Sequence, residues 1–198
     1  MSRDVVLATH NAHKVVELQR ILGAALGDVR LVAYDGPEPV EDGVTFEENA
    51  LIKARAAASF TGLPALADDS GICVDILGGS PGIFSARWGG PARDAAANLD
   101  LLLWQLSDVA EPHRGGRFAC AAAVVLPDGT ETVLRRDWPG RILTERHGEH
   151  GFGYDPIFLP ADADVSAAEL SPAEKDARSH RTLAFTALAP EIRRLLGD

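Results

Sequence analysis

Apolar residues recur along parts of the chain at the spacing of an amphipathic helix. In the stretches 13–22 and 94–106 they stand three and four positions apart, which places them on one helical face. A helix is also predicted over 45–60, because Thr45-Phe46-Glu47-Glu48 fits a capping box, with threonine at the N-cap and glutamate three residues later. The remaining helices are expected after a second capping box, Ser171-Pro172-Ala173-Glu174, and over 181–196.

Short apolar runs bounded by polar or glycine-rich segments predict strands. They cover residues 5–8, 65–67, 72–76, 118–126 and 132–138. The last two are joined through Pro127-Asp128-Gly129, which is a strong hairpin signal. Because strands and helices alternate but one hairpin intrudes, we predict an α/β fold with a mixed sheet.

The composition, 46% apolar and 24% charged over 198 residues, is typical of a globular protein, and we predict one domain over 1–198. No apolar run approaches the roughly 20 residues of a membrane helix, and the first residues lack a signal peptide's apolar stretch. We therefore expect a cytoplasmic protein with no membrane partner. Cys73 and Cys120 stand in apolar runs, as reduced core cysteines do.

The formal net charge is −10, which argues against a sequence-independent grip on nucleic acid. A free nucleotide is still compatible, because a few placed cations and a metal ion can hold a triphosphate. The chain has 16 arginines but only three lysines, Lys14, Lys53 and Lys175. Each lysine is therefore a candidate for a position that needs a compact ammonium group rather than a planar guanidinium; chance survival is the alternative.

The segment from Thr9 to Lys14 lies between the first predicted strand and the first predicted helix. Thr9 or Asn11 can cap that helix, and the free N–H groups of such a terminus favour anions. Lys14, in the first turn, can reach a phosphate. A plain N-cap is the alternative, and the segment lacks the glycine pattern of a P-loop.

Acidic residues suggest a magnesium site. Asp68 and Asp69 follow a buried-looking strand, at the edge where α/β folds place ligands. If the strand geometry continues, they point to opposite faces and only one meets the ligand. Magnesium usually takes one or two carboxylates plus phosphate oxygens and water, and Glu41, in the acidic loop 35–43, could pair with Asp69. A polar turn and a solvated loop are the alternatives.

Three other segments carry candidate contacts. Asn49 and Lys53 stand four residues apart on one helical face, where Lys53 could instead extend along alanines to solvent. The segment 151–156 offers aromatic faces to a nucleobase and backbone groups to its edge; a glycine-rich turn with core aromatics is the alternative. The run 174–181 is polar and, taken alone, typical of a solvated helix face.

Taken in order, these motifs closely resemble the inosine/xanthosine triphosphate pyrophosphatase family over nearly the whole chain. The series is Thr-x-Asn-x-x-Lys, Glu-Asp-Gly-x-Thr-Phe-Glu-Glu-Asn-Ala, Ala-Asp-Asp-Ser-Gly, Ser-Pro-Gly-Ile-Phe-Ser-Ala-Arg-Trp, Gly-Phe-Gly-Tyr-Asp-Pro and Ser-His-Arg. The resemblance implies an elongated mixed β-sheet flanked by helices, in two lobes with a nucleotide cleft between them. It also implies a homodimer, Mg²⁺ as cofactor, and hydrolysis of ITP, dITP and XTP to the monophosphate and pyrophosphate.

The resemblance also implies roles for individual residues. Thr9, Asn11 and Lys14 resemble triphosphate contacts, with Lys53 a further one. Glu41 and Asp69 resemble the magnesium ligands, with Asp69 also the general base, and Ser70 resembles a substrate contact. Phe152, Gly153, Tyr154 and Asp155 resemble the base-binding segment, and Lys175, His180 and Arg181 the remaining nucleotide contacts.

Two positions depart from the family pattern, since many relatives carry glycine where this chain has His10 and His13. These side chains could narrow access to the phosphates or add a pH-sensitive donor. A pyrophosphatase for other modified nucleotides and a nucleotide-binding protein without hydrolysis are the alternative functions. A Rossmann oxidoreductase is set aside, because no Gly-x-Gly-x-x-Gly follows the first strand.

Overall fold

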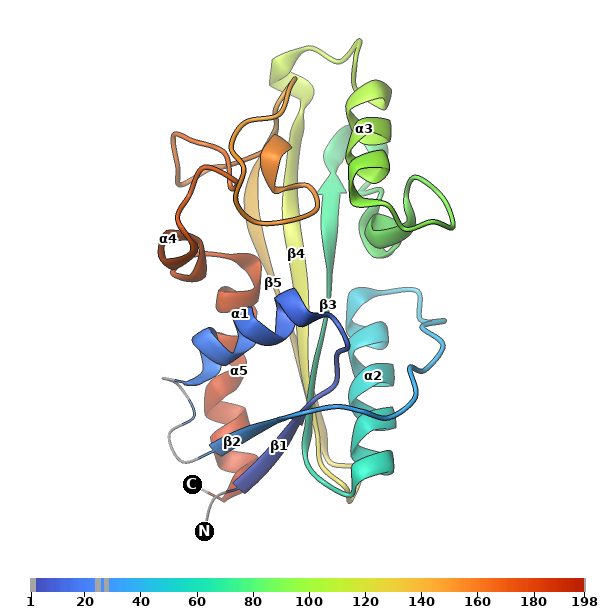
Figure 1. Ribbon diagram of the computed structural model, residues 1–198, viewed down its shortest axis with the longest axis vertical. Coiled ribbons are helices and arrows are strands. Elements are labelled where there is room, and N and C mark those ends of the chain that lie inside the picture. The colour runs from blue at the N-terminus through green and yellow to red at the C-terminus, as the bar shows by residue number, and fades with distance from the viewer. Residues whose placement is uncertain (1–2, 24–25, 27–28, 198) are drawn as a thin grey trace. The chain divides into compact units, whose positions relative to one another are not determined.

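The computed structural model describes residues 3–23, 26 and 29–197, and its strands form one six-stranded sheet in the order β2-β1-β3-β4-β5-β6 (Figure 1). β1 pairs in parallel with β2 and β3, whereas β5 and β6 are antiparallel, so the predicted mixed sheet of an α/β fold is confirmed. The strands are β1 (Arg3–Leu7), β2 (Val29–Ala33), β3 (Ala65–Val74), β4 (Gly115–Val125), β5 (Glu131–Ile142) and β6 (Phe158–Pro160). The α-helices are α1 (Ala12–Gly23), α2 (Phe46–Thr61), α3 (Ala95–Gln105), α4 (Pro172–Asp176) and α5 (His180–Leu196). Across these residues, every helix falls short of the length and apolar character that a membrane span needs.

The chain divides into two compact units, and β3, β4 and β5 each contribute residues to both. Unit 1 comprises residues 1–69, 120–136 and 181–198, and unit 2 comprises 70–119 and 137–180. The boundary on β3 falls between Asp69 and Ser70, so neighbouring residues of one motif belong to different units.

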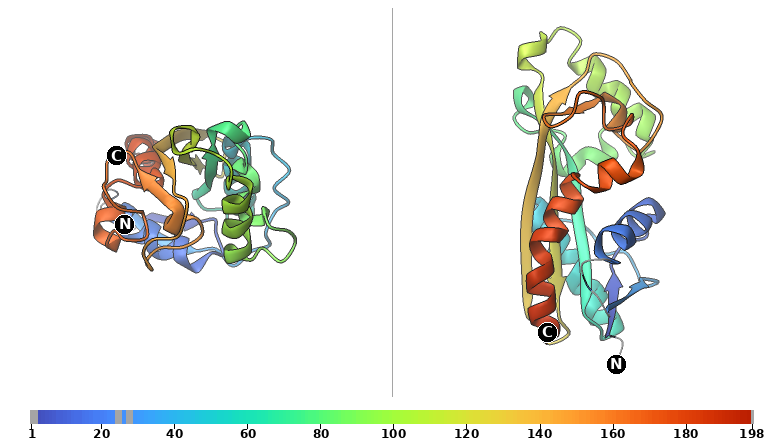
Figure 2. Two further views of the ribbon diagram at one scale, coloured as in Figure 1. Left: turned by 90° about the horizontal axis from the view of Figure 1, so that it is seen from above. Right: turned by 90° about the vertical axis from the view of Figure 1, so that its left-hand side faces the viewer.

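Unit 1 has helices on both faces of its part of the sheet. α1 and α5 cover one face, where α5 runs along the strands (Figures 1 and 2). Their apolar side chains, among them Leu18, Leu22 and Phe185, form a core with Leu7 of β1 and Val124 of β4. α2 lies on the other face (Figure 1) and buries an alanine-rich side. Small side chains let a helix approach the sheet closely.

Unit 2 packs α3 and the chain after β5 around its own apolar core. Leu99, Leu102 and Leu106 are buried in that core, as the predicted amphipathic pattern requires. Trp138 is 2% exposed and belongs to the same core, whereas Trp104 on α3 is 72% exposed.

Local signals at helix ends are largely confirmed. The Thr45 hydroxyl caps α2 by accepting from the Glu48 N–H at 3.1 Å. The Glu48 carboxylate accepts from the N–H of Val44, at 2.7 Å, rather than from the N-cap residue itself. The box at Ser171 and Glu174 closes in both directions and begins α4.

The prediction of two short strands interrupted at residues 68–71 is wrong, because β3 continues from Ala65 to Val74 without a break. Asp68 and Asp69 therefore lie within a strand and not at its carboxyl edge. A strand with two adjacent acids is stable here because each carboxylate meets cationic or amide partners, which offset the cost of burial. β2 and β6 are strands that the apolar pattern did not predict.

Candidate functional site

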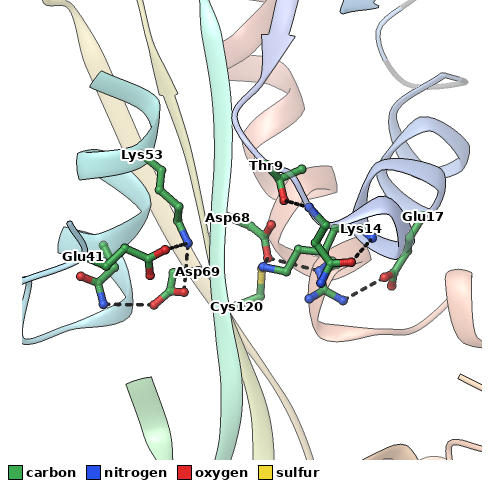
Figure 3. Close-up of polar contacts among 11 residues, drawn as sticks. Thr9, Lys14, Glu17, Glu41, Lys53, Asp68, Asp69 and Cys120 are labelled. Atoms are coloured by element: carbon green, nitrogen blue, oxygen red, sulfur yellow. Dashed lines mark hydrogen bonds and ion pairs between the residues drawn. The ribbon is translucent and has the colours of Figure 1, made fainter. Parts of the chain in front are cut away.

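The two adjacent aspartates of β3 point to opposite faces of the sheet (Figure 3). The Asp68 carboxylate accepts from Lys14 Nζ at 2.9 Å and from Arg181 Nε at 3.2 Å. Asp69 instead accepts from Lys53 Nζ at 3.1 Å and from Asn49 Nδ2 at 3.3 Å. The expectation that the two side chains point to opposite faces if the strand continues is confirmed, because side chains alternate along a continuous strand. That only one of them meets a ligand stays a prediction.

On the Asp69 side, two carboxylates converge on one ammonium group. Lys53 Nζ lies 3.1 Å from Asp69 Oδ1 and 3.4 Å from Glu41 Oε1 (Figure 3). Burial lowers the pKa of Lys53, but the charges of Asp69, Asp68 and Glu41 outweigh it and the net shift is upward. Lys53 is therefore charged at neutral pH, and it does not simply extend along alanines to solvent.

Asn49 connects the acidic loop to the strand. Its Oδ1 accepts from the Gly43 N–H at 3.0 Å, and its Nδ2 donates to Asp69 Oδ2. A Cβ at position 43 would lie 2.7 Å from Asn49 Oδ1 and from the Glu48 Cβ, so glycine permits this close approach. Asn49 is 1% exposed. Sequence reasoning placed it beside Lys53 but assigned it no role.

The donor set of Glu41 and Asp69 fits a hard divalent cation such as Mg²⁺. Both are carboxylates, and both approach the same cationic atom from different elements. In the described part of the chain, no group of three or more His, Cys, Asp and Glu side chains is arranged to hold a metal ion. A metal bound here would take its other ligands from phosphate and water, which is the usual arrangement for magnesium.

On the other face of β3, Asp68 is the centre of a buried charge network. Its side chain is fully buried, Arg181 is 2% exposed, and Arg181 Nη1 also donates to Glu17 Oε2 at 2.8 Å. Cys120 Sγ lies 4.0 Å from Asp68 Oδ2. Burial raises the pKa of Asp68, but the charges of Lys14 and Arg181 hold it well below its usual range. Burial also raises the pKa of Cys120, as expected for a reduced core cysteine.

The first loop caps α1 with its own side chains. Asn11 Oδ1 accepts from the Lys14 N–H at 3.3 Å, and Thr9 Oγ1 accepts from the Asn11 N–H at 3.2 Å. The N-cap role is thus present for Asn11, and contact with phosphate stays a prediction. His10 Nδ1 lies 3.0 Å from Glu38 Oε1 and its ring contacts Tyr34. The side chain of His13 lies outside the described residues.

In unit 2, Asp155 organises the glycine-rich segment. Its Oδ2 accepts from the Phe152 N–H at 2.8 Å and from Lys175 Nζ at 2.5 Å. Lys175 Nζ also lies 5.0 Å from the centre of the Phe152 ring, in a cation–π contact. Gly151 has φ +75°, and a Cβ there would lie 2.2 Å from Asp155 Oδ2, so the turn requires glycine.

Tyr154 faces the core of unit 2. Its hydroxyl donates to the Ser85 carbonyl at 2.9 Å, the residue is 5% exposed, and burial raises the pKa of the phenol. The Tyr154 side chain therefore fills the core. A ligand could reach only the backbone groups of this segment at Tyr154. The neighbouring Gly153 has φ +64°, and no atom lies within 4 Å of where a Cβ would be. The other predicted contact, Ser70, is half-buried on β3.

His180 is buried beside two aromatic rings. Its imidazole stacks on Phe118 with centroids 4.8 Å apart and 12° between the planes, and a second near-parallel ring, Trp138, lies at 6.5 Å. Because Lys175, His180 and Arg181 are all at most 7% exposed, the interpretation of 174–181 as a solvated face is wrong for these three residues.

All three lysines of the chain, each a predicted site residue, form ion pairs with aspartates. Lys14 binds Asp68, Lys53 binds Asp69, and Lys175 binds Asp155. Their side chains are 15%, 13% and 9% exposed, respectively. Each pair brings together residues far apart in the sequence. The scarcity of lysine thus marked positions where a compact ammonium group is held in a mostly buried ion pair.

The chain is similar in sequence to a known protein family and to several of its members. A model of the Ham1 family matches residues 5–191. A dITP/XTP pyrophosphatase of Leifsonia xyli subsp. xyli is 61% identical over 191 residues, which cover 96% of each chain. A dITP/XTP pyrophosphatase of Streptomyces avermitilis is 55% identical and is matched over 98% of each chain.

Solved structures agree in fold. A nucleoside-triphosphatase / dITP/XTP pyrophosphatase from Mycobacterium abscessus is 47% identical, with a TM-score of 0.77 over 96% of this chain and 100% of that one. A HAM1 protein from Coxiella burnetii is 37% identical, with a TM-score of 0.87 over 97% and 99%. The similarity therefore extends over both units.

Proposed function

Because the chain belongs to the Ham1 family, we propose that it hydrolyses dITP, ITP and XTP to the nucleoside monophosphate and pyrophosphate. The names of its relatives supply the substrate class. The observation that carries the chemistry is the convergence of Glu41 and Asp69 on one cation position, where Lys53 supplies an ammonium group able to meet phosphates. Such hydrolysis removes inosine- and xanthosine-type purines from the nucleotide pool before polymerases use them.

Glu41 and Asp69 would hold Mg²⁺ in this proposal. When bound, the ion supplies positive charge against the negative charge that develops on the phosphates. The fit of the donor set supports magnesium over softer metals, since both ligands are carboxylates.

Asp69 is the proposed general base. It orients a water molecule and accepts its proton as the water oxygen attacks the α-phosphorus. The bond from that phosphorus to the oxygen bridging the α- and β-phosphates breaks, and pyrophosphate leaves. Asn49 holds one oxygen of Asp69, so the carboxylate is oriented before the substrate arrives, and positioning supplies a large part of the acceleration.

Thr9, Asn11, Lys14 and Lys53 are proposed to bind the triphosphate. Both lysines are already paired with aspartates, so their charges are balanced in the protein without a nucleotide. Arg181 is buried and binds both Asp68 and Glu17. We propose that it acts on the nucleotide indirectly, by holding Asp68 and, through it, Lys14.

The base is proposed to meet the segment Phe152–Asp155 together with Lys175 and His180, and Ser70 is a further proposed contact. Inosine and xanthine present a 6-oxo acceptor where adenine presents an amino group. A site that donates to this oxygen is left with an unpaired donor when ATP binds, which costs about 1–3 kcal/mol. Because the Phe152 N–H already donates to Asp155, the main-chain N–H groups of Gly153 and Tyr154 are better candidates to donate to the 6-oxo group.

A homodimer stays a prediction of the family resemblance, and a cytoplasmic location stays a prediction from the amino-acid sequence. A pyrophosphatase for other modified nucleotides is the second candidate function. It shares the Glu41–Lys53–Asp69 cluster and differs only in the base that it selects.

The deciding experiment measures pyrophosphate release from equal concentrations of ITP, XTP, dITP, ATP and GTP, with Mg²⁺ and with EDTA. We expect metal-dependent release from the first three substrates, far above that from ATP and GTP. Activity on none of the five would overturn the proposal. Equal activity on all five would retain the reaction and remove the selectivity.

A further inference from the structure

The cation position formed by Glu41 and Asp69 is filled by a side chain of the protein itself. Lys53 Nζ lies 3.4 Å from Glu41 Oε1 and 3.1 Å from Asp69 Oδ1, so both carboxylates share one ammonium group. Lys53 comes from α2, Asp69 from β3 and Glu41 from the acidic loop. Three separate parts of unit 1 therefore meet at the Lys53 ammonium group.

Asp69 and the loop that carries Glu41 are linked without the help of Lys53. Asn49 accepts from the Gly43 N–H at 3.0 Å and donates to Asp69 Oδ2 at 3.3 Å, and it is itself 1% exposed. This leaves Asp69 Oδ1, the oxygen that faces Lys53, as the oxygen available to a cation. Departure of Lys53 would leave that oxygen oriented toward the same position.

The charges of the cluster do not balance. Glu41 and Asp69 carry two negative charges, and Lys53 supplies one positive charge between them. A divalent cation matches the pair better than an ammonium group does, since unlike charges a few ångströms apart attract strongly near a protein surface. Lys53 has a flexible four-carbon stem, and its side chain retains 13% exposure, so it can move aside.

We propose that Lys53 is an internal competitor of the metal ion at Glu41 and Asp69. A divalent cation displaces its ammonium group from the two carboxylates, and the released group then becomes available to the phosphates of the nucleotide. This inference rests on the proposed metal site. Lys53 would thus pair with Glu41 and Asp69 in the absence of the metal and with the nucleotide phosphates in its presence. Metal binding and phosphate binding by Lys53 are therefore coupled.

The test measures binding of Mn²⁺ alone, without nucleotide, to the full chain by electron paramagnetic resonance. Lys53→Met removes the competing charge, so we expect Mn²⁺ to bind about tenfold more tightly, or better, than to the unmodified protein. Lys14→Met is the matched control, because it also removes one mostly buried ammonium group, but from Asp68. We expect its Mn²⁺ affinity to change by no more than about threefold, as for a more distant charge.

Three results overturn the inference. The first is an unchanged Mn²⁺ affinity in Lys53→Met. The second is an increase in Mn²⁺ affinity in Lys14→Met as large as that in Lys53→Met. The third is an increase in Mn²⁺ affinity, relative to the unmodified protein, that remains in the double variant Lys53→Met/Asp69→Asn. Circular dichroism establishes that each variant is folded, and Lys53→Gln repeats the test with a polar side chain. Pyrophosphate release by the unmodified protein is measured separately, so failure of the proposed function and failure of the competition are distinguishable.

Discussion

At the scale of single residues, Asp69 has a different partner on each carboxylate oxygen. The Asn49 amide holds Oδ2, and the Lys53 ammonium faces Oδ1. One oxygen is thus fixed by a neutral donor while the other meets an exchangeable cation. A carboxylate oriented in this way is suited to positioning a water molecule, because its direction does not depend on the cation.

We predict that Asp69→Asn lowers turnover of dITP by at least about 100-fold, the usual effect of removing a general base. Binding of a non-hydrolysable dITP analogue should change by only a few-fold, since asparagine keeps the size of the side chain. Steady-state kinetics and calorimetry measure the two quantities. Asp42→Asn is the control, because Asp42 is an exposed acid next to Glu41. Near-normal turnover in Asp69→Asn would contradict the assignment of the base.

The sequence allowed the charged members of the site to be predicted more readily than their partners. Scarce lysines and adjacent aspartates are visible as residue types, and Lys14, Lys53 and Asp69 were predicted from them. The partners of Asp68 are 54 and 113 positions away along the chain. Such pairing depends on tertiary structure, so no local pattern could show that Arg181 is buried or that Asp68 binds two cations.

At the scale of secondary structure elements, helices were predicted well and edge strands poorly. The apolar spacing and the capping residues of α1, α2 and α3 act within one or two turns, so they can be read locally. β2 and β6, which were missed, are the two ends of the strand order. β6 has only three residues, and β2 is exposed or half-buried throughout. Edge strands pair on one side only and can be short, and the brief apolar stretches at residues 31–33 and 158–159 were not recognised as strands.

The turn at Gly151 yields a prediction for the segment that is proposed to bind the base. Gly151→Ala places a Cβ on Asp155, at 2.2 Å from its Oδ2, in a left-handed conformation. We expect it to lower the free energy of unfolding by more than the roughly 1–2 kcal/mol that left-handed strain alone costs, and to raise the KM for dITP. Gly153→Ala is the matched control, since its φ is +64° but nothing lies within 4 Å of the added Cβ. Urea denaturation compares the two variants, and equal losses of stability would show that the contact with Asp155 is unimportant.

At the scale of the whole molecule, acid should destabilise the fold through Asp68. The charges of Lys14 and Arg181, acting against burial, hold the pKa of this carboxyl well below its usual value of about 4. The unfolded chain therefore binds the proton at a higher pH than the folded chain does. The stability that the ionised carboxylate contributes is complete above about pH 5, and it decreases as the pH falls through 4 and below.

Asp68→Asn tests this acid sensitivity, because it removes the titrating group while leaving Lys14 and Arg181 in place. At pH 7 we expect a loss of about 3–5 kcal/mol in the free energy of unfolding, the usual cost of leaving buried charges without their partner. As the pH falls from 5 to 3, the unmodified protein loses the contribution of Asp68 and the variant has none to lose, so the difference between them should narrow. Urea denaturation at pH 7, 5, 4 and 3 measures that difference, with Asp42→Asn as the exposed control. A difference that stays constant over this range would mean that the pKa of Asp68 is the same in the folded and the unfolded chain. The charge network around Asp68 would then not account for the acid sensitivity of the protein.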